Sequence, residues 1–331
     1  MASTHWLLFR LSSLGDVALT SGPMRYWHEH LGWEFTVLTR EVFTPLFTRH
    51  PAVREVISPR EQDLGTGWPG FCRSLAAAYQ SSGLMDLHGN WRARLLSCFW
   101  RGPVRRYPKQ GLKRRLFLLH KNPGLSARLR AHSVPQRYLL AAQPVAPPPG
   151  ELRPAIYLQP EERSLAKEKL LAALPAGRGG APVALHPYAA HPLKTWPPDY
   201  WRTLAEKLDA IGRTWFVVGR GPGLFPGEAH DFSNRTDLRE LCALLAEAGV
   251  LVSGDSGPMH LATAVDTPVI ALFGPTTAEW GFFPTGTRDL TLEKELPCRP
   301  CSAHGRARCP RNGLCLRSIT PEEITELLEK P

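Results

Sequence analysis

Short apolar runs typical of buried strands recur along the first 90 residues, and each is followed by room for a helix or a long loop. The runs are His5 to Leu11, Phe35 to Leu38, Val53 to Ile57 and Leu84 to Leu87. The first leads into Ser12-Ser13-Leu14-Gly15-Asp16, a turn before an apolar-periodic helix that starts near Val17. A strand, a glycine-containing turn and a helix, in that order, open a βαβ unit.

A proline-rich segment interrupts this alternation. Pro144-Val145-Ala146-Pro147-Pro148-Pro149-Gly150 cannot carry a helix and supplies few backbone donors to a sheet. We therefore interpret residues 146–154 as a linker between an N-terminal domain, 1–145, and a C-terminal domain, 155–318. The capping box Thr320-Pro321-Glu322-Glu323 predicts a terminal helix within 319–331.

The alternation of strands and helices restarts after the linker. Expected strands are 155–158, 183–186, 215–218, 250–253 and 269–273, and expected helices are 160–174, 198–211, 238–247 and 258–265. Two successive βα halves separated by a proline hinge predict an α/β protein with two Rossmann-like domains that face a central cleft.

Composition and charge narrow the class of protein. A hydrophobic fraction of 43% with 21% charged residues excludes global disorder. The apolar run Trp6 to Phe9 is cut by Arg10 and is too short for a membrane span or a secretory signal, so a cytoplasmic protein is expected.

The net charge of +10 predicts an anionic partner. No acidic residue lies between Asp86 and Glu151, whereas basic residues are frequent there, and a solvated helical face normally interleaves both signs. A phosphate-bearing polymer, an anionic lipid surface and nucleic acid are the alternatives. Nucleic acid is disfavoured because the stretch has no helix-turn-helix or RNP-type pattern.

Two loops at the ends of expected strands suit a diphosphate. In the segment Ser253-Gly254-Asp255-Ser256-Gly257-Pro258-Met259-His260, free N–H groups and the helix dipole would favour an anion, although a simple N-cap explains the same residues. Lys194, in the loop after 183–186, is either merely exposed or a counter-charge for a departing diphosphate. Asp16 is either an N-cap or a general base, for which a modestly raised pKa would help.

Four of the seven cysteines cluster near the C-terminus. Cys298, Cys301, Cys309 and Cys315 have the spacing Cys-x2-Cys-x7-Cys-x5-Cys in a loop, 298–315, that is rich in arginine and proline. Four thiolates at this spacing could close a structural Zn or Fe site, and reduced thiols or two local disulfides are the alternatives. Nothing in the spacing suggests an open coordination position for a catalytic metal.

Three motifs together resemble one family. Arg10 to Thr20, His186-Pro187 with Lys194-Thr195-Trp196-Pro197, and Gly254 to Leu261 with Val269 to Thr276 resemble the glycosyltransferase family 9 heptosyltransferases. Weaker similarities, such as Asp86-Leu87-His88-Gly89-Asn90, lie between them. The resemblance covers nearly the whole chain in the same order.

The resemblance implies a GT-B fold and an inverting, metal-independent transfer of a heptose or related sugar from an ADP-activated donor to a lipopolysaccharide-core or related glycolipid acceptor. No cofactor is then required for catalysis. The residues that match the family's motifs are Asp16 as the base, and Gly15, Lys194, Asp255, Ser256, Gly257 and His260 for the donor. Arg92, Arg105, Arg106, Arg114 and Arg115 are candidates for the acceptor or membrane side, which places the protein peripherally on the inner face of the cytoplasmic membrane.

Two departures from the family pattern leave the donor's base and sugar open. Tyr188-Ala189-Ala190 stands where relatives often read Gly-Ala-Ser, and the segment Gly219 to Phe232 is short and lacks an obvious acidic match. The alternatives are therefore another nucleotide-sugar transferase, a nucleotide-sugar epimerase, or a non-catalytic relative.

Overall fold

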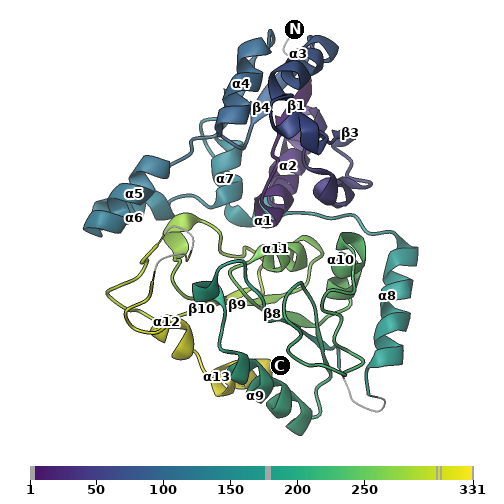
Figure 1. Ribbon diagram of the computed structural model, residues 1–331, viewed down its shortest axis with the longest axis vertical. Coiled ribbons are helices and arrows are strands. Elements are labelled where there is room, and N and C mark those ends of the chain that lie inside the picture. The colour runs from purple at the N-terminus through teal and green to yellow at the C-terminus, as the bar shows by residue number, and fades with distance from the viewer. Residues whose placement is uncertain (1–3, 176–179, 303–304, 306–307, 330–331) are drawn as a thin grey trace. The chain divides into compact units, whose positions relative to one another are not determined.

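The structure is a computed structural model, and it describes residues 4–175, 180–302, 305 and 308–329. The chain divides into two compact units. The first comprises residues 1–110 and 132–157, and the second comprises residues 111–131 and 158–331. Each unit is built on one five-stranded parallel sheet (Figure 1).

The sheet of the first unit has the order β3-β2-β1-β4-β5. Its strands are β1 (His5–Phe9), β2 (Glu34–Leu38), β3 (Val53–Ile57), β4 (Gly83–Asp86) and β5 (Val104–Arg106). The central strand β1 is buried beyond His5, as its continuous apolar run predicts for a parallel strand covered on both faces. Sequence patterning missed β5, because Val104 is the only apolar residue among its three.

The helices of the first unit surround this sheet. They are α1 (Leu14–Ala18), α2 (Ser21–Leu31), α3 (Trp68–Ala78), α4 (Trp91–Phe99) and α7 (Val134–Leu139). Trp68 and Cys72 of α3 and Leu96 of α4 pack with Phe9 in one buried core. The first helix begins at Leu14, three residues earlier than its apolar periodicity suggests, so Asp16 lies inside α1 rather than in a turn before it.

The second sheet has the order β10-β9-β8-β6-β7. Its strands are β6 (Val183–His186), β7 (Trp215–Val217), β8 (Val250–Gly254), β9 (Val269–Phe273) and β10 (Leu290–Glu293). The helices after the linker are α8 (Pro160–Ala173), α9 (Pro198–Ala210), α10 (Leu238–Ala246), α11 (Gly257–Ala264), α12 (Leu314–Arg317) and α13 (Pro321–Glu329). The elements shared with the sequence prediction agree to within about one residue at each end, while β10 and α12 were not foreseen. Residues 330–331 of the predicted terminal helix lie outside the described residues.

Two helices that precede the linker in sequence belong to the second unit. They are α5 (Gly111–His120) and α6 (Pro123–Arg130), whereas the sequence assigned residues 1–145 to the N-terminal domain. Phe117 and Leu129 are buried there against Trp280. Because these contacts join residues about 150 positions apart, local patterning around the proline segment cannot reveal them.

The proline-rich segment is packed rather than free. Leu152 is fully buried, and the backbone N–H of Ala155 donates to Ser21 Oγ of α2 at 2.9 Å. The strand expected at 155–158 does not form, so the first unit continues through Tyr157. Residues 146–154 therefore run along the first unit and are held to it.

No helix within the part of the chain that the structure describes has both the length and the apolarity to cross a membrane.

Gly22 of α2 marks the tightest contact with this segment. A Cβ there would overlap the carbonyl oxygens of Leu152 and Arg153, the second at 2.7 Å. We expect Gly22→Ala to destabilise the protein by about 1–3 kcal/mol, because overpacking against a backbone cannot be relieved by a rotamer change. Gly70→Ala on α3, where a Cβ meets nothing within 4 Å, is the control and should be neutral or slightly stabilising. Urea unfolding that shows equal effects for the two variants would contradict the packing argument.

A buried histidine makes the fold sensitive to acid. His50 Nδ1 accepts from the Ala52 N–H at 3.2 Å and Nε2 donates to the Ser21 carbonyl at 3.2 Å, an arrangement that requires the neutral ring. Burial lowers the pKa of His50 from 6.5 to about 4.

The sign of the pH dependence follows from this shift. As the pH is lowered below 6.5, the unfolded chain is protonated at His50, whereas the folded chain is protonated there only near pH 4. The free energy of unfolding therefore decreases as the pH is lowered from 6.5 to about 4. We expect His50→Gln to flatten that slope by up to about 1.4 kcal/mol per pH unit, measured by urea unfolding at several pH values. His120→Gln, at an exposed histidine of α5, should leave the slope unchanged.

Candidate functional site

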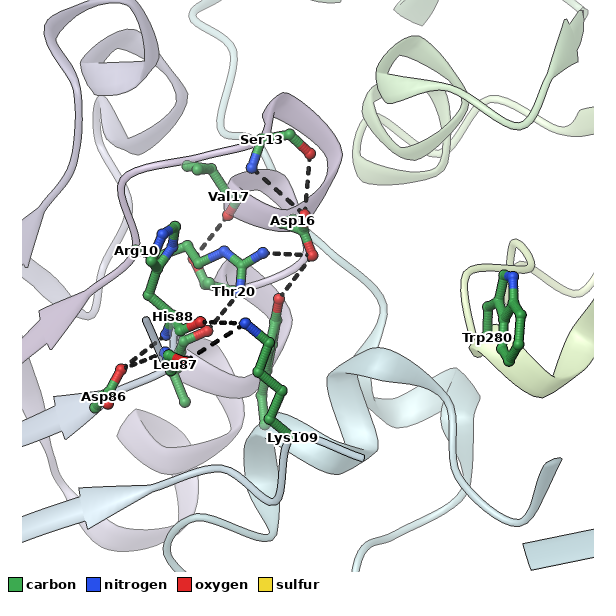
Figure 2. Close-up of polar contacts among 12 residues, drawn as sticks. Arg10, Ser13, Asp16, Val17, Thr20, Asp86, Leu87, His88, Lys109 and Trp280 are labelled. Atoms are coloured by element: carbon green, nitrogen blue, oxygen red, sulfur yellow. Dashed lines mark hydrogen bonds and ion pairs between the residues drawn. The ribbon is translucent and has the colours of Figure 1, made fainter. Parts of the chain in front are cut away.

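The first group of polar side chains lies at the carboxyl ends of β1 and β4. These strands are parallel neighbours, with Phe9 opposite Asp86, so the residues that follow them meet at one edge of the sheet. Arg10 follows β1 and donates through Nη1 to the carbonyl of Leu87, which follows β4, at 2.6 Å (Figure 2). The Arg10 side chain is thereby fixed at this edge.

Asp16 lies against the Arg10 guanidinium. Its Oδ1 is 2.6 Å from Arg10 Nη2 and accepts from Tyr138 Oη at 3.2 Å. Its Oδ2 accepts from the Ser13 hydroxyl at 3.0 Å and from the Ser13 backbone N–H at 3.4 Å (Figure 2). Asp16 therefore caps the start of α1 from inside the helix, while Ser13 is the N-cap residue. Its side chain is 19% exposed and reaches solvent.

Asp16 does not have the raised pKa that would help a general base. Burial alone would raise it, but the Arg10 guanidinium and the hydrogen bonds from Ser13 and Tyr138 outweigh burial, and the pKa lies below its ordinary value. Asp16 is thus an ionised carboxylate near neutral pH, already in the form that accepts a proton. Gly15, the adjacent residue, is buried in α1.

Arg10 and Tyr138 complete this group, and the sequence did not assign either to the site. Burial raises the pKa of the Tyr138 phenol well above its ordinary value, so its hydroxyl stays protonated and donates. Arg10 could have been noticed as a charge directly after a buried strand. Tyr138 is 122 residues from Asp16, and only the tertiary fold joins them.

The loop after β4 is ordered by a buried carboxylate, that of Asp86. Asp86 Oδ1 accepts from the backbone N–H groups of His88 at 3.0 Å and Gly89 at 2.7 Å. Lys109 Nζ donates to the His88 carbonyl at 3.4 Å (Figure 2). The segment Asp86 to Asn90, one of the weaker similarities to the family, thus has a structural role: the Asp86 carboxylate accepts hydrogen bonds from backbone N–H groups of the loop.

In the second unit, loops after three adjacent strands converge on one carboxylate. Lys194 follows β6, Asp255 follows β8 and Thr276 follows β9. Asp255 Oδ2 is 2.5 Å from Lys194 Nζ and accepts from Thr276 Oγ1 at 2.7 Å. Lys194 is thus fixed beside the start of α11 rather than standing free in solvent.

Arg299 holds the loop that carries Thr276, and the sequence did not identify it. Its guanidinium donates to the carbonyls of Gly274 at 2.5 Å, Lys294 at 2.6 Å and Thr276 at 3.0 Å, and pairs with Glu293 at 2.7 Å. A planar donor with five N–H groups suits this crowded set of acceptors. Arg299 acts on Asp255 through Thr276 and is a positioning residue.

The start of α11 combines a solvent-reaching edge with a buried support. Asp255, Ser256 and Gly257 are partly buried, and the Asp255 side chain is 9% exposed. The Ser256 hydroxyl lies 3.1 Å from His186 Nδ1 and 3.2 Å from Ser253 Oγ. Burial lowers the pKa of His186 to about 4, so its ring is neutral. His260 is only 4% exposed, and its ring centroid lies 6.2 Å from that of Phe282.

Tyr188, one of the departures from the family pattern, packs on the other departure. Its hydroxyl lies 2.8 Å from Ser233 Oγ, and a Cβ on Gly221 would overlap its ring. The glycines of the segment that begins at Gly219 therefore allow a close approach to the tyrosine. The two departures form one packed region of the second unit.

The five candidate arginines are divided between the two units. Arg92, Arg105 and Arg106 belong to the first unit, whereas Arg114 and Arg115 belong to the second. Arg92 donates to the Leu64 carbonyl at 2.6 Å, Arg105 to the Ala142 carbonyl, and Arg114 to the Trp280 carbonyl at 3.0 Å. Arg106 Nε lies 3.6 Å from Asp86 Oδ2.

Arg115 is exposed on α5. The other four arginines thus take part in hydrogen bonds or an ion pair within the protein. The acceptor or membrane role of the five arginines stays a prediction.

The four-cysteine metal site stays a prediction. No group of three or more histidine, cysteine, aspartate or glutamate side chains among the described residues is placed to hold a metal ion. Cys298, Cys301, Cys309 and Cys315 are free thiols. Cys315 is buried in α12, whereas Cys301 is exposed, and residues 303–304 and 306–307 of the loop 298–315 lie outside the described residues.

Comparisons with known proteins place this geometry in a family. The family model of glycosyltransferase family 9 (heptosyltransferase) matches residues 73–308, more than half of the chain. Lipopolysaccharide heptosyltransferase 1 of Pseudomonas aeruginosa is 31% identical over 162 residues, which cover 41% of this chain and 44% of the relative. Lipooligosaccharide heptosyltransferase 2 of Campylobacter jejuni is 29% identical over 102 residues, which cover 29% of this chain and 30% of the relative. The chain therefore spans less than half the length of these curated relatives in the matched regions.

A solved structure extends the likeness to the whole fold. The E. coli ADP-heptose lipopolysaccharide heptosyltransferase II has a TM-score of 0.71 at 20% identity, and the match covers 98% of this chain and 97% of that one. The expectation of a GT-B fold with two Rossmann-like domains is confirmed. The order of the motifs, the two parallel sheets and the match of the family model lead to one assignment: the chain belongs to glycosyltransferase family 9, the heptosyltransferase family.

Proposed function

We propose that this chain transfers a heptose, or a closely related sugar, from an ADP-activated donor to the core of a lipopolysaccharide or a related anionic glycolipid. The observation that carries the proposal is the Lys194–Asp255–Thr276 group beside the start of α11, in a chain of this family. The identity of the donor is supported by the E. coli relative, whose name includes ADP-heptose.

Asp16 acts as the base in this proposal. The acceptor hydroxyl gives its proton to the carboxylate as its oxygen attacks the anomeric carbon, and the bond from that carbon to the diphosphate breaks. The low pKa makes Asp16 a weak base but keeps it ionised and ready. The paired Arg10 guanidinium and Tyr138 hydroxyl fix the direction of the carboxylate, which reduces the cost of reaching the transition state.

The leaving diphosphate is stabilised by Lys194 and by the backbone N–H groups at the start of α11. Negative charge grows on the diphosphate as the glycosidic bond breaks, and a fixed cation with oriented amide dipoles favours that change. These groups supply the positive charge that a divalent metal supplies in other transferases, so we propose metal-independent transfer without a cofactor. Asp255 holds Lys194 in place in the free protein.

The proposed acceptor is a membrane glycolipid, so we propose a cytoplasmic protein that binds the inner face of the cytoplasmic membrane. The net charge of +10 favours an anionic surface. A non-catalytic relative is the second candidate, because Tyr188 fills the region where relatives often carry small residues. Nucleotide binding separates the two.

The donor site can be tested by calorimetric titration with ADP, GDP and UDP. We expect one nucleotide, ADP, to bind, and Lys194→Ala to weaken it roughly 10- to 100-fold, because a hydrogen bond to a charged group is lost and Asp255 is left facing the diphosphate. Lys207→Ala is the control and should bind ADP as the wild type does. Lys207 of α9 forms an ion pair with Glu322 of α13. If no nucleotide binds the wild type, the transferase proposal fails and the result supports a non-catalytic relative.

The base can be tested by rates of sugar transfer to a delipidated core oligosaccharide. We expect Asp16→Asn to lower kcat about 10²–10⁴-fold with ADP binding unchanged, because the amide cannot take the acceptor proton. Asp63→Asn, at an acidic residue that caps a short helical turn of the first unit, is the control and should keep full activity. Equal rates for Asp16→Asn and wild type would rule out the assigned base.

A further inference from the structure

Helix α5 has one face that is fixed to the second unit. Phe117 is buried against Trp280, with their ring centroids 6.3 Å apart, and Arg114 donates to the Trp280 carbonyl at 3.0 Å. The neighbouring helix α6 adds Arg130 and Ser126, whose side chains contact Glu279 Oε1 at 2.8 Å and 2.7 Å. The helix pair, which lies side by side in Figure 1, is thus held by specific contacts on one side.

The opposite face of α5 is an exposed leucine stripe. Leu112, Leu116 and Leu119 are 71%, 41% and 75% exposed. At 3.6 residues per turn the three leucines fall within an arc of about 60°, and Phe117 and Arg114 lie on the other side of the helix. An aligned stripe is different from single exposed leucines, which are normal on protein surfaces.

Basic side chains flank the leucine stripe on both sides. Arg115 lies about 60° from Leu112 on one side, Lys113 about 100° on the other, and both are exposed. Residues 111–131 contain no acidic residue. Glu279, the acidic group that contacts α6, is 3% exposed and is paired with Arg130, so it does not offset the exposed charge.

We propose that α5 docks this protein on an anionic membrane. Leu112, Leu116 and Leu119 would lie at the boundary between the lipid headgroups and the acyl chains. Lys113 and Arg115 would lie at the lipid phosphates. An amphipathic helix with leucines on one face and basic residues at its flanks binds membrane surfaces in this orientation. The charge favours lipid over a second copy of the chain, because two copies would bring the same exposed cations together. The inference deepens the proposed membrane location, on which it rests, and assigns it to a surface of the second unit.

The test is co-sedimentation with vesicles of phosphatidylglycerol and phosphatidylethanolamine, compared with vesicles of phosphatidylcholine. We expect the full chain to prefer the anionic vesicles, and Leu112→Ser/Leu116→Ser/Leu119→Ser to bind at least about tenfold more weakly. Arg115→Gln should bind about fivefold more weakly, since each basic residue near the surface contributes roughly 1 kcal/mol. Added salt should weaken binding of the wild type.

Helix α8 supplies a matched control. Leu165 and Leu171 are 65% and 71% exposed but lie on a helix that also carries Glu161, Glu162 and Glu168. Leu165→Ser/Leu171→Ser should bind vesicles as the wild type does. If the triple variant also binds as the wild type does, or if light scattering shows that the wild type is a dimer that the triple variant dissociates, the proposal is overturned.

Failure of this proposal can be separated from failure of the proposed function. Transfer to a delipidated core oligosaccharide should be unchanged in the triple variant, whereas Lys194→Ala should lose transfer and keep vesicle binding. Loss of transfer to the delipidated acceptor in the folded triple variant, checked by circular dichroism, would show that α5 acts in catalysis instead of docking.

Discussion

All the strands of both sheets run parallel, and this constraint determines where polar residues can gather. Parallel neighbours end at the same edge, so loops that are far apart in sequence emerge side by side there. In the first unit, Arg10 after β1 meets the Leu87 carbonyl after β4. In the second unit, loops after β6, β8 and β9 bring Lys194, Asp255 and Thr276 together. The chemistry of each unit therefore depends on strand order more than on any single motif.

Partly buried ion pairs give these edges their fixed geometry. Asp16 with Arg10, and Asp255 with Lys194, are each supported by a hydroxyl donor, Tyr138 in one case and Thr276 in the other. Removing one partner would leave a poorly solvated charge, so such pairs are costly to break even where they add little net stability. The same pairing lowers the pKa of Asp16. The carboxylate is therefore a weaker base, but it stays ionised and keeps a defined orientation.

The basic stretch shows how one sequence feature can serve several purposes. Arg92, Arg105 and Arg114 use their guanidinium groups on backbone carbonyls, where a planar fork of donors fits well. Arg115 and Lys113 remain exposed beside the leucine stripe. The sequence shows that this stretch has no acidic residues. The fold decides which of its basic side chains form internal contacts and which stay on the surface.

Local sequence patterns predicted the βα alternation, most element bounds and the family motifs, and they singled out Asp16, Lys194 and the loop at Asp255 as candidates. These features are local, because apolar runs and turn residues reflect the covering of each strand within a few positions. Only long-range packing shows that α5 and α6 belong to the second unit, that Tyr138 reaches Asp16, and that Arg299 holds the loop at Thr276. Each of these depends on contacts between residues distant in sequence or on the direction of a side chain, and the hydrophobic pattern carries neither.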